Sequence, residues 1–125
     1  MTQEDKMLLI KDLSARLPYA VTVEHTSGFK GTLHDLTAVH LYDGDNIKDI
    51  DCGIHFFGDE DWFSIEYFKP YLFPLSSMTE KQKIELTCII DSDYAQIDWY
   101  NKNHIDYRGL ITKGLAINAT GKNIY

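Results

Sequence analysis

Apolar side chains recur at helical spacing near the start of the chain. Thr2 is a suitable N-cap for a helix, and Glu4 and Asp5 would lie near its positive end. Pro18 disfavours helical backbone at the residue before it. We therefore expect a helix within residues 1–17, beginning at Thr2. Its apolar face would consist of Met7, Ile10, Leu13 and Leu17.

From residue 18 to residue 68 the pattern changes to alternation of apolar and polar positions, which is typical of strands. The alternating apolar positions include Tyr19, Val21 and Val23 at one end and Phe63, Ile65 and Tyr67 at the other. Turn-forming residues at 26–28, 43–45 and 58–61 divide this segment into about five short strands. Such a segment predicts a small SH3-like antiparallel β-barrel or a strongly bent sheet.

Two prolines mark the next segment. Pro70 and Pro74 bracket three apolar residues, and proline fits poorly in a central strand or a helix interior. We therefore expect residues 69–78 to form a Pro-rich strap that lies along the barrel and buries its apolar side chains.

Helical signals return in residues 79–114. Thr79 and Gln82 have the spacing of a capping box, and the polar residues 91–93 can cap a further helix that ends near 101–103. Asp106 is placed to cap a last short helix over 107–113, with Gly114 as its left-handed terminator. Residues 115–125 are expected to form a frayed tail. The whole chain is thus predicted to be one α+β domain.

Charge narrows the classes of partner. The net charge of the 125 residues is -7, and residues 1–70 carry six basic and thirteen acidic side chains, so the excess lies in that half. A negative field repels phosphate, which disfavours nucleic acid and anionic membranes as partners. The first residues lack a basic and apolar leader, and the chain has only two cysteines, Cys52 and Cys88. These features predict a cytoplasmic protein with reduced thiols.

Metal and catalytic motifs are weak. The cluster of Asp43, Asp45, Asp49 and Asp51 departs from calcium-loop spacing, and a solvated acidic edge explains it more simply. His34 and His40 have even spacing on an expected strand, and Cys52 and His55 form a Cys-x-x-His motif with no second half. We also find no nucleophile elbow and no phosphate loop. The sequence therefore predicts a non-enzyme with no metal and no cofactor.

Aromatic residues are in excess. The positions crowded into residues 56–73 are Phe56, Phe57, Trp62, Phe63, Tyr67, Phe68, Tyr71 and Phe73. They either fill the core between sheet and helices or form a partner or ligand surface. A second group lies near two expected helix boundaries, and its polar side-chain tips either meet internal partners or face a ligand. It consists of Trp99, Tyr100, His104, Tyr107 and Arg108. Arg108 is expected to pair with Asp98 or Asp106. The candidate binding residues are Trp62, Phe63, Tyr71, Trp99, Tyr100, His104, Tyr107 and Arg108.

Two stretches resemble a known family. The segments Lys-Pro-Tyr-Leu-Phe-Pro-Leu-Ser-Ser-Met-Thr-Glu, at 69–80, and Asp-Trp-Tyr-Asn-Lys-Asn-His-Ile-Asp-Tyr-Arg-Gly-Leu-Ile, at 98–111, are similar to small uncharacterised proteins encoded in gut-bacterial and bacteriophage genomes. The resemblance covers about a fifth of the chain. It implies a variable barrel-like part before the Lys-Pro-Tyr segment and a phage or prophage setting in a bacterial cell. It implies no activity, cofactor or site residue.

Two functions fit these features. The first is a non-enzymatic, phage-type accessory protein that binds another protein through its aromatic and acidic surface, to which a basic partner would be complementary. The alternative is a small-ligand binder that sequesters a nucleotide-type signalling molecule, with aromatic rings stacking on the base and Arg108 holding phosphate. The sequence does not fix the oligomeric state.

Overall fold

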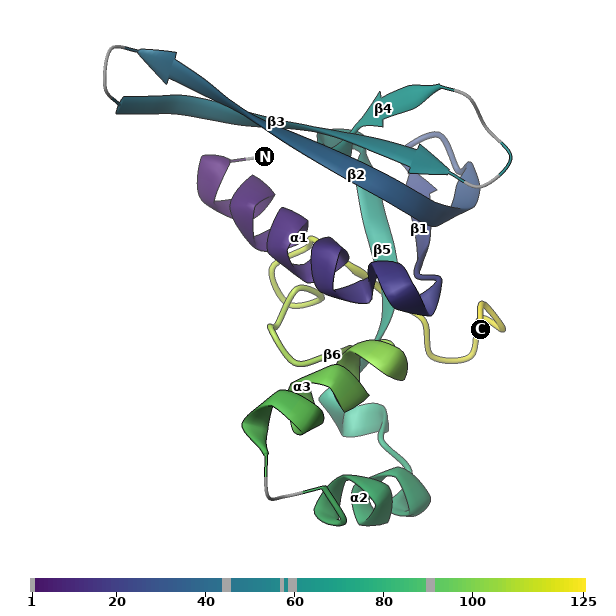
Figure 1. The fold of residues 1–125 in the computed structure, drawn as a ribbon. Coiled ribbons are helices and arrows are strands. Elements are labelled where there is room, and N and C mark those ends of the chain that lie inside the picture. The colour runs from purple at the N-terminus through teal and green to yellow at the C-terminus, as the bar shows by residue number, and fades with distance from the viewer. Residues whose placement is uncertain (1, 44–45, 57, 59–60, 90–91) are drawn as a thin grey trace. The chain divides into compact units, whose positions relative to one another are not determined.

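The computed structural model describes residues 2–43, 46–56, 58, 61–89 and 92–125, with side chains omitted within 37–51. Its contacts divide the chain into two compact units, Met1–Pro70 and Tyr71–Tyr125, which we call unit 1 and unit 2. The secondary structure is α+β, as expected, and Figure 1 shows the order of the elements. The two units are described separately below.

Unit 1 begins with the expected helix. α1 (Gln3–Arg16) starts where predicted, because the Thr2 hydroxyl accepts a hydrogen bond of 3.1 Å from the backbone N–H of Asp5. A 3-10 turn, Leu17–Tyr19, follows, and the left-handed backbone of Ala20 ends it. Leu9 and Leu13 are fully buried. So are Asp12 and Arg16, whose side chains form a bidentate ion pair at 2.8 and 3.2 Å.

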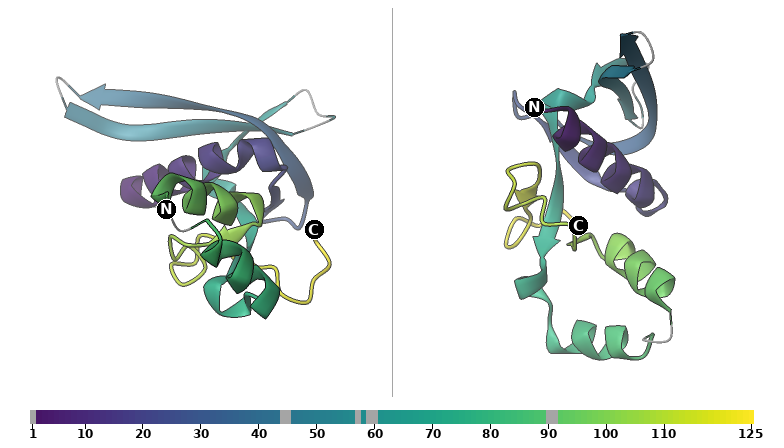
Figure 2. Two further views of the ribbon diagram at one scale, coloured as in Figure 1. Left: turned by 60° about the horizontal axis from the view of Figure 1, so that its bottom comes forward. Right: turned by 90° about the vertical axis from the view of Figure 1, so that its left-hand side faces the viewer.

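An antiparallel sheet follows α1. Its strands are paired in the order β4-β3-β2-β1-β5, and the hairpin of β2 and β3 lies beside α1 (Figures 1 and 2). Two strands are much longer than the short ones we expected. The described strands form an open sheet, so the barrel is unconfirmed. The bounds are β1 (Thr22–His25), β2 (Lys30–Asp43), β3 (Asn46–Phe56), β4 (Trp62–Ser64) and β5 (Phe68–Pro74).

The core of unit 1 follows the alternation in the sequence. Val21 and Val23 are fully buried, together with Leu33, Ile54, Phe56, Ile65 and Phe68. Gly31 has a steric role here, because a Cβ atom at this position would lie 2.7 Å from Cδ1 of Phe56. The alternation fails near both ends of the segment. Tyr19 belongs to the 3-10 turn Leu17–Tyr19 and not to a strand. The expected strand over Phe63, Ile65 and Tyr67 stops at Ser64, and Ile65–Tyr67 is a 3-10 turn.

The Pro-rich strap was predicted wrongly, because Phe68–Pro74 is the strand β5. Residues 68–70 pair antiparallel with β1, with Val23 opposite Pro70. Proline removes one N–H donor but still offers its carbonyl, so a strand tolerates it where that donor is not needed. Tyr71 and Leu72 are buried and Phe73 is half-buried, which agrees with the expected loss of exposure.

Unit 2 contains the rest of β5 and the C-terminal elements. Residues 71–74 pair in parallel with β6 (Ile105–Asp106) and β7 (Ile117–Asn118). A 3-10 turn, Leu75–Ser77, precedes the helices α2 (Glu80–Thr87) and α3 (Asp93–Lys102). The predicted capping box of Thr79 and Gln82 is present, and Ser92 caps α3 through the N–H of Ala95.

Two expectations for the C-terminal residues are wrong. Residues 107–113 are not helical: Gly109 adopts a positive φ of 76°, and a hydrogen-bonded turn follows it at residues 110–113. Residues 115–125 are not a frayed tail either. Leu115, Ala116 and Ala119 are buried, and β7 pairs with β5. Gly114 does have the left-handed backbone predicted for it, with φ of 75°.

We predict that Leu72→Ala lowers the free energy of unfolding by about 2–5 kcal/mol, because it truncates a large side chain that is fully buried in β5. Urea unfolding followed by circular dichroism measures this loss. Leu75→Ala is the matched control: Leu75 is 48% exposed, so the same change should alter stability by only about 0.5 kcal/mol. Equal effects of the two changes would contradict the burial of β5.

Candidate functional site

Unit 1 contains a pocket lined mainly by aromatic side chains. Its volume is about 240 Å³, and we call it the aromatic pocket. One of its rings, Phe29, is 48% exposed, which is unusual for a large apolar side chain. Tyr67, which is also half exposed, lies next to the aromatic pocket, with its ring centroid 6.1 Å from that of His25. The lining residues are His25, Ser27, Phe29, Phe63 and Phe68.

The turn between β1 and β2 holds one wall of the aromatic pocket. The N–H of His25 donates to the Phe29 carbonyl at 2.7 Å, and the N–H of Gly28 donates to the His25 carbonyl at 2.8 Å. Gly28 takes a φ of 97°, which favours glycine. Nδ1 of His25 accepts from the N–H of Ser27 at 3.0 Å, so a neutral ring carries its proton on Nε2. The turn therefore fixes both the ring and its tautomer.

Two phenylalanine rings that line the aromatic pocket, Phe63 and Phe68, pack against the buried ring of Phe56. Phe56, Phe63 and Phe68 come from β3, β4 and β5, and their centroids lie 5.2–5.9 Å apart. Phe29 meets Phe56 edge-on at 5.5 Å, and His25 meets Phe68 edge-on at 4.9 Å. Edge-on and tilted pairs at these separations are favourable. The pocket is therefore held by rings from three strands and a tight turn.

Trp62 lies elsewhere, although it is adjacent to Phe63 in the chain. Successive residues of a strand point to opposite faces. Trp62 is 50% exposed and stacks on His55, with the centroids 5.2 Å apart and the planes 24° apart. His55 in turn meets His34 edge-on, and their Nδ1 atoms are 3.3 Å apart. The two candidates Trp62 and Phe63 therefore belong to different surfaces.

The six candidates in unit 2 form two groups. Tyr100 contacts Trp99 edge-on at 5.8 Å and stacks on Tyr107 at 5.4 Å. The Arg108 guanidinium lies 4.7 Å from the Tyr107 ring centroid and donates to its hydroxyl at 2.7 Å. His104 belongs to the other group. It stacks on Tyr125 at 3.6 Å, and the Tyr125 hydroxyl donates to the carbonyl of the buried Tyr71.

The polar tips of Tyr107 and Arg108 thus contact each other. This contact favours an internal partner over a ligand as the partner of the Tyr107 hydroxyl. Of the two carboxylates expected to pair with Arg108, Asp106 does not. Its two oxygens accept the backbone N–H groups of Leu110 and Ile111 at 2.9 Å each. Pairing of Arg108 with Asp98 stays a prediction.

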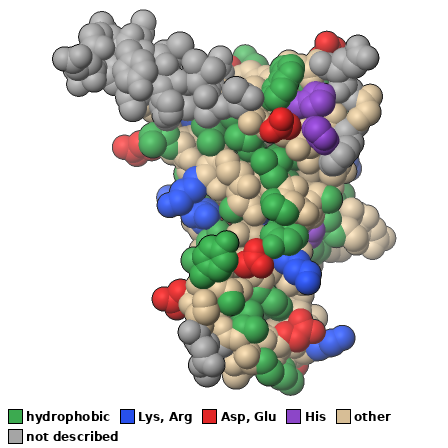
Figure 3. Space-filling model, viewed as in Figure 1, with side chains coloured by type: hydrophobic (Ala, Val, Ile, Leu, Met, Phe, Trp, Pro, Cys, Tyr) green, Lys and Arg blue, Asp and Glu red, His purple; other side chains and the backbone are tan. Residues whose placement is uncertain are grey.

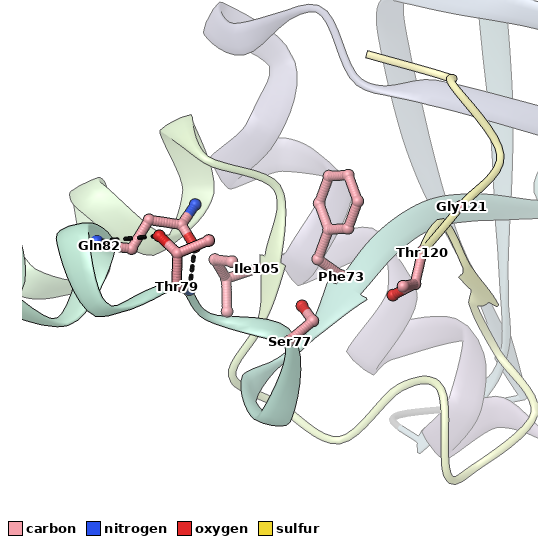
Figure 4. A pocket seen from close by; sticks show the side chains of 7 residues that line it. All are labelled: Phe73, Ser77, Thr79, Gln82, Ile105, Thr120 and Gly121. Carbon is pink, nitrogen blue, oxygen red and sulfur yellow. Dashed lines mark hydrogen bonds between the residues drawn. The ribbon is translucent and has the colours of Figure 1, made fainter.

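Two pockets lie in unit 2. One, of about 510 Å³, is lined by Arg108 and Tyr107 together with residues of the 3-10 turn at Leu75–Ser77. The other, of about 220 Å³, is drawn in Figure 4. There the capping bonds between Thr79 and Gln82 close one side, and the ring of Phe73 stands opposite. The capping bonds occupy the Thr79 hydroxyl and the Gln82 side-chain oxygen.

Metal ligands are sparse. Within the described ranges, no group of three or more His, Cys, Asp or Glu side chains is placed to hold a metal ion. Cys52 is buried, Cys88 is exposed, and both are thiols. The acidic cluster of Asp43, Asp45, Asp49 and Asp51, and also His40, lie outside the residues whose side chains are described.

Comparison with protein-family models, curated proteins and solved structures finds no match to this chain. In the part of the chain that the structure describes, no helix is both long enough and apolar enough to cross a membrane. The candidate sites therefore stand on their own geometry.

Sequence reasoning missed His25, Phe29 and the pair of His34 with His55. A signal for Phe29 existed, because Gly28-Phe29-Lys30-Gly31 has hairpin-turn chemistry and a phenylalanine in such a turn has little chance of full burial. The histidine pair had no such signal. Its two residues are 21 positions apart, and only the pairing register brings them together.

We predict that Asp106→Ala lowers the free energy of unfolding by about 1.5–3 kcal/mol, because it removes a buried carboxylate that accepts two backbone N–H groups. Thermal and urea unfolding measure the loss. Asp106→Asn keeps one acceptor oxygen in a side chain of the same shape, so its loss should be smaller. If Asp106→Ala unfolds as the wild type does, the carboxylate does not hold this turn.

Proposed function

We propose that this chain is a non-enzymatic, phage-type accessory protein that binds a basic segment of another protein. The aromatic pocket receives one large apolar side chain of that segment. The observation that carries the proposal is the half-exposed ring of Phe29 beside a pocket whose other rings are held in place by their neighbours. Exposed aromatic rings next to a preformed pocket are typical anchor sites at protein interfaces.

The size of the aromatic pocket supports a side chain as its occupant. At about 240 Å³ it is smaller than most small-molecule sites, which span about 300–1,000 Å³. Its lining offers few polar groups, and Nδ1 of His25 is already bonded to Ser27. A phosphate or a base edge would therefore find few hydrogen-bond partners in the pocket. An apolar side chain would be stabilised there, because the pocket removes its surface from water.

The charge of unit 1 supports a basic partner. Residues 1–70 carry six basic and thirteen acidic side chains, and seven of the acidic ones fall within residues 43–61. Complementary charge speeds association and orients the partner. We also propose that the strands of unit 1 have an SH3-like arrangement. Such an arrangement would fit peptide binding, because SH3 domains bind peptide segments in grooves lined by aromatic residues.

A second candidate function rests on the larger pocket of unit 2. Its volume of about 510 Å³ suits a small molecule, and Arg108 in its lining could bind an anion such as a nucleotide phosphate. Against it, the Arg108 guanidinium already contacts Tyr107. A thermal-shift panel of nucleoside phosphates tests it: a saturable rise in Tm for the wild type, lost in Arg108→Ala, would favour this function over the first.

We predict that selection from a random peptide display library against the wild-type chain enriches peptides with one large apolar residue flanked by Lys or Arg. Phe29→Ala should weaken binding of an enriched synthetic peptide by about tenfold or more, since it removes an exposed ring beside the pocket. Stability should change little, because the ring is half outside the core. Fluorescence anisotropy of the labelled peptide gives the affinity.

Tyr94→Ala is the matched control for that experiment. Tyr94, in unit 2, is even more exposed than Phe29, so its loss should leave the peptide affinity unchanged. The affinity should also fall with added salt. Enrichment of acidic peptides, or equal loss of affinity in both variants, would refute the aromatic pocket as the binding site.

A further inference from the structure

We propose that His34 and His55 together bind one divalent transition-metal ion of the zinc type at the surface of unit 1. The two Nδ1 atoms face each other at 3.3 Å, from neighbouring strands. Imidazole nitrogen is the common protein ligand for such ions. This site is separate from the aromatic pocket, because none of the pocket's lining residues belongs to the pair.

An irregularity in the sheet creates the pair. Leu33 is opposite Phe56 in the register of β2 and β3, and the next paired residue is Asp35, opposite His55. His34 is therefore an extra residue on β2, which is the arrangement of a β-bulge. Bulges redirect side chains, and they recur beside functional sites. Here the bulge brings the His34 ring against the His55 ring, at a centroid separation of 5.2 Å.

The separation of the two nitrogens fits joint ligation. Zinc binds histidine nitrogen at about 2.0–2.1 Å in tetrahedral sites, which places two nitrogens on the same ion about 3.3–3.4 Å apart. The observed separation is 3.3 Å. The same two atoms can also share a hydrogen bond at this separation, so metal binding would replace that bond. The two nitrogens thus have the separation that joint ligation of one ion requires.

Proton placement sets the conditions for binding. A hydrogen bond between the two Nδ1 atoms requires one of them to carry a proton. A metal ion requires both lone pairs, so both rings must be neutral with their protons on Nε2. The metal ion therefore takes the place of the hydrogen bond between the two nitrogens.

The site is open to solvent and lies beside a natural reporter. His34 is exposed, His55 is half-buried, and the indole of Trp62 stacks on His55. Figure 3 shows histidine side chains gathered at the surface of the molecule. Because no third ligand joins the pair among the described side chains, water or an added ligand would complete the coordination. A bound paramagnetic ion would quench the emission of Trp62.

The test is titration of the whole chain with Zn²⁺ by calorimetry and with Ni²⁺ by tryptophan fluorescence. We expect saturable binding of one Zn²⁺ per chain and saturable quenching by Ni²⁺. His34→Asn and His55→Asn should each weaken Zn²⁺ binding by about tenfold or more, since each removes one of two ligands. Trp62→Phe should abolish the Ni²⁺ quenching while Zn²⁺ still binds. Mg²⁺, which prefers oxygen ligands, should not compete.

His25→Asn is the matched control and should keep the wild-type affinity, because His25 lines the aromatic pocket and not this pair. Imidazole ¹⁵N chemical shifts of the wild type provide a measurement that does not depend on any variant folding. Zn²⁺ should shift the Nδ1 signals of His34 and His55 and leave the others in place. Absence of saturable Zn²⁺ binding, binding that survives both His→Asn changes, or shifts confined to other histidines would overturn the proposal.

Discussion

The hydrogen bonding of both units depends on β5. Its first residues complete the sheet of unit 1 against β1, and its last residues hold β6 and β7 in unit 2. β6 and β7 have two residues each, which is too short for a stable strand without a longer partner. The apolar side chains Phe68, Tyr71 and Leu72 are buried along the same strand. One seven-residue segment thus supplies both the backbone partners and part of the core.

The aromatic pocket depends on the same strand. Phe68 begins β5, is almost fully buried, and contacts both Phe56 and Phe63. Gly31 leaves room for the Phe56 ring, because a Cβ atom at this position would lie 2.7 Å from Cδ1 of Phe56. Phe29 is the one phenylalanine of the pocket that these contacts leave half exposed. Rigid neighbours around an exposed ring reduce the entropy lost when a partner binds.

Local signals in the sequence predicted the parts of the fold that local chemistry decides. The caps at Thr2, Thr79 and Ser92 involve residues three positions apart, so spacing alone reveals them. β5 could not be predicted in this way, because the cost of Pro70 depends on whether a neighbouring strand needs an N–H donor at that position, which proline lacks. The His34–His55 pair depends on a register shift, and the carboxylate of Asp106 caps a turn where the pattern predicted a helix. β5 and the histidine pair arise from tertiary pairing, whereas the bonds of Asp106 are local and only the type of element that they stabilise differs from the prediction.

The alternation of side chains along β4 separates the two proposed sites of unit 1. Phe63 lies against the rings of the aromatic pocket, whereas its neighbour Trp62 stacks on His55 beside the metal pair. A shift of one residue in the pairing of β3 with β4 would exchange the two faces. Both sites therefore require the same register, in which His55 is opposite Trp62 and Ile54 is opposite Phe63. Ile54 is fully buried, so such a shift would also expose apolar core surface, and this cost keeps Trp62 and Phe63 on their separate surfaces.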